Sequence, residues 1–199
     1  MEQHLPQVCA AKPPPNLACD GDEGHWPVAA DGPAYAGAMV SQTDAGMPRR
    51  LLVVHHTPSP GMQAMLEAAL AGARDEQIEG VEVVIRPALT AGVVDVLEAD
   101  GYLLGTPANI GYLSGALKHF FDQIYYPCLD ATRGRPFAAY VHGNEGLEGA
   151  VRAMSSITSA LGWEPVAPVL ELTGQPDAEA LAGCTELGGV LAATLMPDP

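Results

Sequence analysis

The sequence predicts an α/β protein in which helices cover both faces of a parallel sheet. Short apolar runs alternate with stretches in which apolar residues recur at helical spacing. Two of the runs, LLVV at 51–54 and GYLLG at 101–105, are apolar on both faces of the strand. That pattern is typical of parallel strands buried on both sides. A three-layer α/β/α sandwich with five strands is the simplest arrangement that satisfies it.

The elements follow one another as strand, loop and helix. The predicted strands cover residues 51–54, 81–86, 101–105, 137–143 and about 164–172. The predicted helices lie within 62–73, 90–100, 113–124, 150–161 and about 177–195. Proline cannot donate to a sheet ladder, so Pro165 and Pro168 predict that the fifth strand lies at an edge.

Composition limits the classes of partner. A chain of 199 residues with 48% hydrophobic residues can bury one substantial core. The formal net charge is −15, from 9 basic and 24 acidic residues. Such a chain repels polyanions and has no basic stripe to neutralise phosphates, so we expect no nucleic-acid partner.

Cysteine usage and the N-terminus favour a cytoplasmic protein. The four cysteines are scattered, without a CxxC pair or the dense framework of small secreted domains. His4, Cys9, Cys19 and His25 match no compact zinc-ligand spacing, so we expect no metal. The first residues do not resemble a signal peptide, and no segment has the apolar length of a membrane span.

The chain divides by composition near residue 48. Residues 1–48 are rich in Pro, Gly and Asp and show neither helical nor strand periodicity, which predicts an extended or disordered tail. Isolated aromatic residues such as Trp26 and Tyr35 leave docking of this tail open as an alternative. Residues 49–199 are the predicted folded domain.

Three turn-rich loops follow predicted strands. They are HHTPSPG at 55–61, GTPANIGYLSG at 105–115 and HGNEGLEG at 142–149. In a doubly wound sheet, all three loops converge on the carboxyl edge of the strands, where ligands bind. The glycines in these loops permit close backbone approach or a positive φ, which suits a loop that wraps a ligand and also suits a plain surface turn.

The segment GTPANIGYLSGALKHFFD at 105–122 is similar to a segment of the flavodoxin-like family, in its branch of FMN-binding NAD(P)H-dependent reductases and quinone reductases. The resemblance covers roughly residues 50–195 and implies a flavodoxin-like sandwich with strand order 2-1-3-4-5. It implies FMN as cofactor, NAD(P)H as electron donor and a homodimer.

The resemblance also implies which residues surround the flavin. The third-strand loop would line the ring through Thr106, Pro107, Ala108, Asn109, Ile110, Gly111 and Tyr112. We favour Asn109 and Gly111 as flavin contacts, whereas Tyr112 can equally pack in the core or at a subunit contact. The fourth-strand loop would place His142, Gly143, Asn144 and Gly146 near the pyrimidine edge, although His142 can instead cap the strand end.

The first loop departs from the family pattern. Thr57, Ser59, Gly61 and Met62 stand where the phosphate would bind at a helix N-terminus. Pro58 and Pro60 remove two backbone donors, and no Lys or Arg is near in sequence. Either the hydroxyls, the remaining N–H groups and the helix dipole hold the phosphate, or the site has been lost.

Three functions remain from this sequence. The leading hypothesis is an FMN-dependent oxidoreductase that passes electrons from NAD(P)H to a quinone or a similar small acceptor. A flavin carries such chemistry itself, so we assign no catalytic side chain. The alternatives are a flavodoxin-like electron carrier for protein partners and a flavin-free interaction scaffold.

Overall fold

A parallel sheet forms the centre of the protein. The computed structural model describes residues 47–197. The sheet runs in the order β2 (Val81–Pro87), β1 (Arg49–His55), β3 (Gly101–Asn109), β5 (Pro136–Gly143) and β6 (Glu164–Pro165). Neighbours along this path pair in parallel. Counting only the five predicted strands, this is the order 2-1-3-4-5, so the predicted topology is confirmed.

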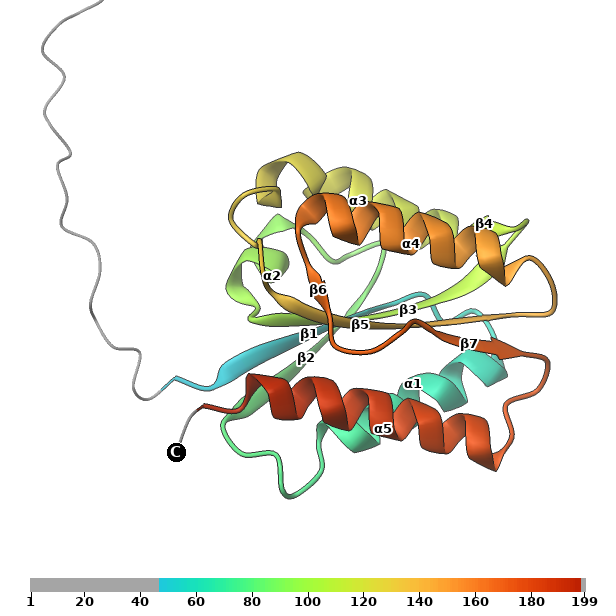
Figure 1. Cartoon of the computed structure of the whole chain (residues 1–199), viewed down its shortest axis with the longest axis horizontal. Helices are drawn as coiled ribbons and strands as arrows, with labels where there is room; N and C mark the ends of the chain where they lie inside the picture. Colours follow the sequence, from blue (N-terminus) through green and yellow to red (C-terminus); the bar gives the residue numbers. More distant parts are fainter. Residues whose placement is uncertain (1–46, 198–199) are drawn as a thin grey trace, which may run out of the picture. The chain divides into compact units, whose positions relative to one another are not determined.

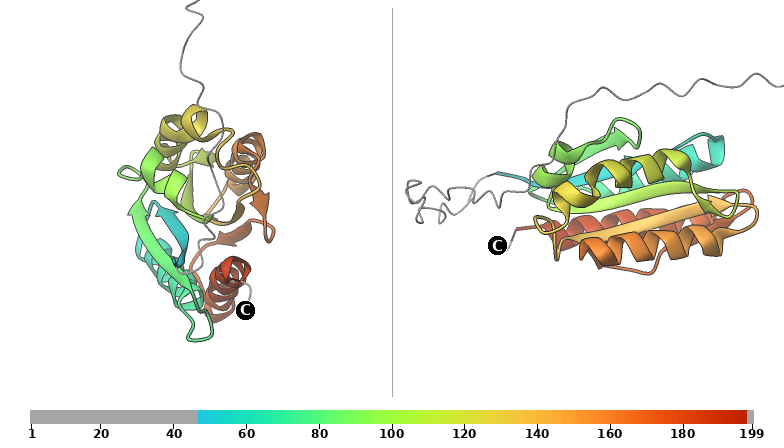
Figure 2. Two further views of the ribbon diagram at one scale, coloured as in Figure 1. Left: turned by 90° about the vertical axis from the view of Figure 1, so that its left-hand side faces the viewer. Right: turned by 90° about the horizontal axis from the view of Figure 1, so that it is seen from above.

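Helices cover both faces of the sheet (Figure 1). α1 (Pro60–Ala73) and α5 (Ala178–Leu195) lie on one face. α2 (Val93–Glu98), α3 (Gly115–Cys128) and α4 (Leu147–Leu161) lie on the other. The end-on view in Figure 2 shows the three layers that alternating strands and helices predict.

The strand residues alternate between two cores. In β1, Leu51 and Val53 pack toward α1 and α5, whereas Leu52 and Val54 pack toward the opposite layer. All four side chains are fully buried, as expected for a central strand covered on both faces. This alternation positions the last residues of each strand, and therefore the site at the carboxyl edge.

The fifth predicted strand lies at the edge and is interrupted. It consists of β6 and β7 (Leu170–Thr173), which pair with the two ends of β5 and leave residues 166–169 outside regular strand structure. Pro165 ends the first piece and Pro168 lies in the gap, so the missing backbone donors account for the break.

The segment predicted as a loop at 105–115 is largely a hairpin. β3 continues through Asn109 and turns back as β4 (Tyr112–Leu113), with Ala108 opposite Leu113 and Asn109 opposite Tyr112. The helix expected at 90–100 is also shorter, because α2 begins at Val93 and ends at Glu98. Both differences are local and leave the sandwich unchanged.

The predicted tail at 1–48 and the four zinc-ligand candidates within it lie almost wholly outside the described residues. Between residues 47 and 197, no cluster of His, Cys, Asp or Glu is suited to a metal ion. Over the same range, the helices are too short or too polar for any of them to cross a membrane.

Candidate functional site

The three predicted loops contact one another at the carboxyl edge of the sheet, on the right of Figure 1. We name each loop by the predicted strand that it follows, so the loops at 55–61, 105–115 and 142–149 are the first, third and fourth. A hydrogen bond of 2.9 Å from the His56 N–H to the Gly105 carbonyl joins the first and third loops. The fourth loop approaches the first through His142 and the third through Gly146. The convergence expected from the topology therefore brings all three loops into one site.

The first loop leads into α1 through a capped helix start. Ser59 is the N-cap residue, and its Oγ accepts a hydrogen bond of 3.3 Å from the Met62 N–H. Pro60 occupies the first helical turn, where a missing N–H costs little because that group has no intrahelical acceptor. The Ser59 hydroxyl proton remains free to be donated to a ligand.

Three backbone donors remain at this helix end. The structure shows no hydrogen-bond partner within residues 47–197 for the N–H groups of Thr57, Ser59 and Gly61. They alternate with Pro58 and Pro60, which have no N–H. Unpaired N–H groups and the positive end of a 14-residue helix together favour an anion. The residues present therefore fit a phosphate group, without the aid of a Lys or Arg in any of the three loops.

Histidines support the first loop. His55 Nδ1 lies 2.7 Å from Thr57 Oγ1. Burial lowers the pKa of the His55 imidazole and the neighbouring His56 lowers it further, which favours the neutral ring. When that ring carries its proton on Nδ1, it donates to Thr57 Oγ1 and leaves the threonine hydroxyl proton free for an anion.

His142 lies between α1 and the turn that follows β7. Its Nε2 is 2.6 Å from the Gly174 carbonyl oxygen. A Cβ at Gly61 would lie 3.5 Å from His142 Cε1, so the ring is close to the start of α1. This position favours the alternative in which His142 ties down the end of the strand.

The β3–β4 hairpin projects from the third strand with a strained tip. Ile110 and Gly111 both have positive φ, at 54° and 68°. A two-residue hairpin turn with two positive φ values is of type I′, for which Asn or Gly is usual at both positions. Ile110 is fully exposed and is the single non-glycine residue with positive φ among the described residues. The chain thus holds an apolar side chain in a costly conformation at the site.

The tip of the hairpin rests on the first turn of α4. A Cβ at Gly149 would lie 1.9 Å from the Gly111 carbonyl oxygen, and one at Gly146 would lie 2.9 Å from Gly111 Cα. Gly146 also has a φ of 70° at the N-cap of α4. Glycine at 149 is therefore required by close approach, and glycine at 146 by both approach and conformation.

Beneath the site, Tyr140 crosses over Gly105. A Cβ at Gly105 would lie 2.3 Å from the Tyr140 hydroxyl, so Gly105 serves close packing and not a positive φ. Tyr140 is fully buried, and its hydroxyl has no hydrogen-bond partner among the described residues. Burial raises the pKa of this hydroxyl strongly, which keeps it protonated.

The structure divides the predicted site residues by exposure. The side chains of Met62, Thr106 and Pro107 are buried. The partly exposed residues are Thr57, Ser59, Gly61, Ala108, His142 and Gly143. The exposed residues are Asn109, Ile110, Gly111, Tyr112, Asn144 and Gly146.

Two of the buried residues have structural partners. Thr106 Oγ1 donates to Ser114 Oγ at 3.0 Å, and Ser114 caps α3 by accepting from the Leu117 N–H at 3.2 Å. The Met62 N–H is already bonded to Ser59, and its side chain lies in the core. Thr106 and Met62 therefore hold the loops in shape, which the resemblance alone does not indicate.

Sequence reasoning placed Gly149 in the loop at 142–149 but assigned it no contact, and it did not assign Tyr140 or the Gly174–Pro176 turn to the site. Gly149 carried a signal, because a glycine inside an amphipathic helix often marks a close backbone contact. Tyr140 carried none, since a tyrosine within an apolar strand is ordinary core composition.

A family model described as NADPH-dependent FMN reductase matches residues 55–175, the stretch that contains all three loops. The chain belongs to this family. The Aquifex aeolicus (strain VF5) flavodoxin is 33% identical over 110 residues, which are 55% of this chain and 58% of that protein. The chain thus matches little more than half the length of this flavodoxin.

Solved structures with the same fold have low sequence identity. A flavodoxin from the domain Archaea superposes with a TM-score of 0.63 at 20% identity, covering 73% of this chain and 98% of that one. A flavodoxin described as WrbA-like, from Agrobacterium tumefaciens, has a TM-score of 0.61 at 16% identity, covering 74% and 97%. These similarities establish the flavodoxin-like fold of this family member.

Proposed function

We propose that this chain is an FMN-dependent oxidoreductase that takes electrons from NAD(P)H and passes them to a quinone or a similar small acceptor. The observation that carries the proposal is the convergence of the three loops around a helix end with unpaired N–H groups. The family match over residues 55–175 supports FMN as the cofactor. Residues 49–199 form the flavin-binding domain in this proposal, with the tail at 1–48 outside it.

The first loop holds the phosphate end of the cofactor. The N–H groups of Thr57, Ser59 and Gly61 and the two hydroxyls donate hydrogen bonds to the phosphate oxygens, and the α1 dipole adds a favourable field. Hydrogen bonds to a charged group contribute about 1.5–3 kcal/mol each, so several of them can offset the missing Lys or Arg. Met62 is left out of this set because its N–H and side chain are already used.

The hairpin and the fourth loop hold the ring end. Asn109, Ile110, Gly111 and Tyr112 offer exposed backbone and side chains, and Gly143, Asn144 and Gly146 lie next to the hairpin. Ala108 lies at the base of the hairpin, while Thr106 and Pro107 support it from within. Bound FMN would supply the hydride and electron transfer, and the chain's residues orient it and shield one face.

The subunit arrangement in this proposal is a homodimer that covers the site. Apolar side chains stand exposed on the hairpin, at Ile110 and Tyr112. Exposed apolar groups around a cofactor site favour burial by a second subunit. Sedimentation that shows only monomer at working concentrations would remove this part of the proposal.

A second candidate is an electron carrier that serves protein partners and does not oxidise NAD(P)H. The 33% identity to the Aquifex flavodoxin favours it. The net charge of −15 also suits docking on basic surfaces. Cytoplasmic location belongs to both candidates and remains part of the proposal.

The test begins with an absorption spectrum of the purified full chain and a titration with FMN. Saturable one-to-one binding supports the cofactor, and oxidation of NADPH or NADH in the presence of a benzoquinone supports the oxidoreductase. Binding without nicotinamide oxidation selects the carrier. If the protein does not bind FMN, both candidates are overturned and the flavin-free scaffold is favoured. The backbone donors that Pro58 and Pro60 remove would then explain the lost phosphate site.

The phosphate site is tested by Thr57→Val, which keeps the side-chain shape and removes the hydroxyl. We expect about a tenfold loss of FMN affinity, from one hydrogen bond to a charged group. Riboflavin affinity stays unchanged, because riboflavin has no phosphate. Thr194→Val, at an exposed position on α5 whose hydroxyl bonds to the Val190 carbonyl, is the matched control. An equal loss for FMN and riboflavin would place Thr57 outside the phosphate site.

A further inference from the structure

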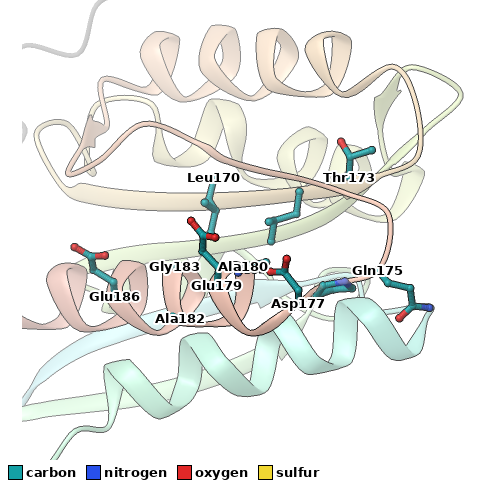
Figure 3. Close-up of a pocket in the computed structure, with 11 residues that line it drawn as sticks. Leu170, Thr173, Gln175, Asp177, Glu179, Ala180, Ala182, Gly183 and Glu186 are labelled. Atoms are coloured by element: carbon teal, nitrogen blue, oxygen red, sulfur yellow. Dashed lines mark hydrogen bonds between the residues drawn. The ribbon is translucent and has the colours of Figure 1, made fainter.

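A groove follows the interrupted edge of the sheet, along residues 165–177 and the facing parts of α4 and α5. One cavity of about 580 Å³ lies between β7 and α5 and is drawn in Figure 3. A second of about 690 Å³ lies between residues 165–169 and α4. A third of about 340 Å³ shares Leu170 with the first and Val169 with the second, so it joins them into one groove.

The groove has an apolar floor and an acidic rim. Its apolar lining comes from Trp163, Val166, Val169, Leu170 and Leu187. Its charged lining residues are all acidic: Glu171, Asp177, Glu179 and Glu186. Figure 3 shows the carboxylates of Glu179 and Glu186 directed from α5 toward the strand that carries Leu170.

No Lys or Arg among residues 47–197 forms an ion pair with a carboxylate of the rim. Arg49, Arg50, Arg86, Lys118 and Arg133 each pair with a carboxylate on other parts of the described chain. None of the three cavities is lined by a Lys or Arg. The carboxylates on the rim therefore face solvent without compensation, which favours a cationic occupant.

The backbone of the edge is also open on one side. β7 pairs with β5 and with no other strand among the described residues. An edge strand presents a row of N–H and C=O groups that an extended peptide can pair with, while its alternate side chains enter pockets beside the strand. An extended segment with alternating apolar and basic residues meets all three features: the free edge, the apolar floor and the acidic rim.

We propose that this groove binds an extended basic segment of a partner protein along β7. A second copy of this chain is a poor occupant, because a two-fold contact would place the same acidic rims against each other. The groove does not include the three loops, although its first cavity borders the proposed flavin site through Gln175 and Pro176. The proposal uses none of the residues assigned to FMN, so it does not depend on FMN binding.

The test uses the full chain labelled with ¹⁵N and a synthetic peptide of alternating lysine and valine, with a peptide of alternating glutamate and valine as the comparison. We expect the basic peptide to cause saturable shifts of the amide signals of residues 166–173 and of the facing part of α5. The acidic peptide should cause no such shifts. The affinity falls as salt is raised, since charge pairs at an exposed rim are screened.

Charge reversal localises the interaction. We expect the double variant Glu171→Lys, Glu186→Lys to bind the basic peptide about tenfold or more weakly. The control is Glu76→Lys with Glu79→Lys, which changes the net charge equally at exposed positions off the groove. In this control, the affinity for the basic peptide falls by less than about twofold. Because all four positions are exposed, dispersed amide spectra are expected for both variants. The corresponding Gln variants serve if a Lys variant does not fold.

Several outcomes would overturn the proposal. If both double variants lose the same affinity for the basic peptide, the net charge explains the binding and the groove does not. If the amide shifts are confined to the loops at 57–61 or 105–115, the peptide binds at the proposed flavin site. Equal binding of the acidic peptide would exclude charge recognition. Self-association that the Glu171 and Glu186 changes abolish would identify a second copy as the occupant.

Discussion

Ile110 shows what a single residue costs at this site. A β-branched residue in the left-handed region is destabilised by about 1–2 kcal/mol, and Asn tolerates that region far better. The Ile110 side chain is fully exposed, so it gains nothing from the core in return. Strain of this kind persists at functional sites, which is the reason to expect that the side chain serves the flavin or a subunit contact.

We predict that Ile110→Asn raises the free energy of unfolding by about 1 kcal/mol while weakening FMN binding or dimer formation. Denaturant unfolding and FMN titration measure the two effects. Val94→Asn is the control, because Val94 is also exposed and β-branched but has no positive φ, so no stability gain is expected there. A loss of stability at Ile110→Asn would show that the turn is not strained.

Tyr140 presents the opposite case, a buried polar atom without a partner. An unsatisfied buried hydroxyl costs about 1–3 kcal/mol of desolvation. We predict that Tyr140→Phe leaves the stability of the apoprotein unchanged or raises it by about 1 kcal/mol, as thermal unfolding would measure. A marked decrease would mean that a water molecule or another group satisfies the hydroxyl in solution.

At the scale of elements, Gly146 and Gly149 let the first turn of α4 pack directly against Gly111 at the tip of the hairpin. Adding a methyl group at Gly149 would bring it to 1.9 Å from the Gly111 carbonyl, a distance at which the backbone must move. Residues 109–112 of the hairpin are exposed, whereas α4 packs into the core, so we expect the hairpin to move when the two collide.

We therefore predict that Gly149→Ala weakens FMN binding by about tenfold or more, although alanine favours a helix. Fluorescence titration with FMN measures the loss. Gly183→Ala is the matched control: it is also helical, and a Cβ there would make an ordinary contact of 3.7 Å with Leu170. If both variants bind FMN like the parent chain, the hairpin does not set the ring site.

The same scale shows what could be predicted from the sequence. The apolar runs at 51–54 and 101–105 fixed the central strands, because burial on both faces leaves a direct mark in composition. The hairpin at 105–113 was missed because Ile110 replaces the Asn or Gly that marks such a turn. The Gly111–Gly149 contact joins residues on different elements, and no local pattern records such a contact.

For the molecule as a whole, the net charge repels the anionic phosphate that the proposed site attracts. The chain has a net charge of −15, while the phosphate it is proposed to hold is itself an anion. The local donors at Thr57, Ser59 and Gly61 act within a few ångströms, whereas the surrounding field extends over about 10 Å at 0.1 M salt. Binding strength thus depends on the loop, and the rate of encounter depends on the whole surface.

This separation predicts that FMN associates faster as salt is raised, since screening removes a repulsive field between like charges. Stopped-flow quenching of flavin fluorescence would measure the association rate, which we expect to rise severalfold between about 0.01 and 0.5 M salt. Riboflavin, which has no phosphate, is the control and should associate at a rate that salt hardly changes. An FMN rate that falls with salt would mean that an attractive local field outweighs the net charge, and the phosphate would then be guided by a positive group that the first loop does not contain.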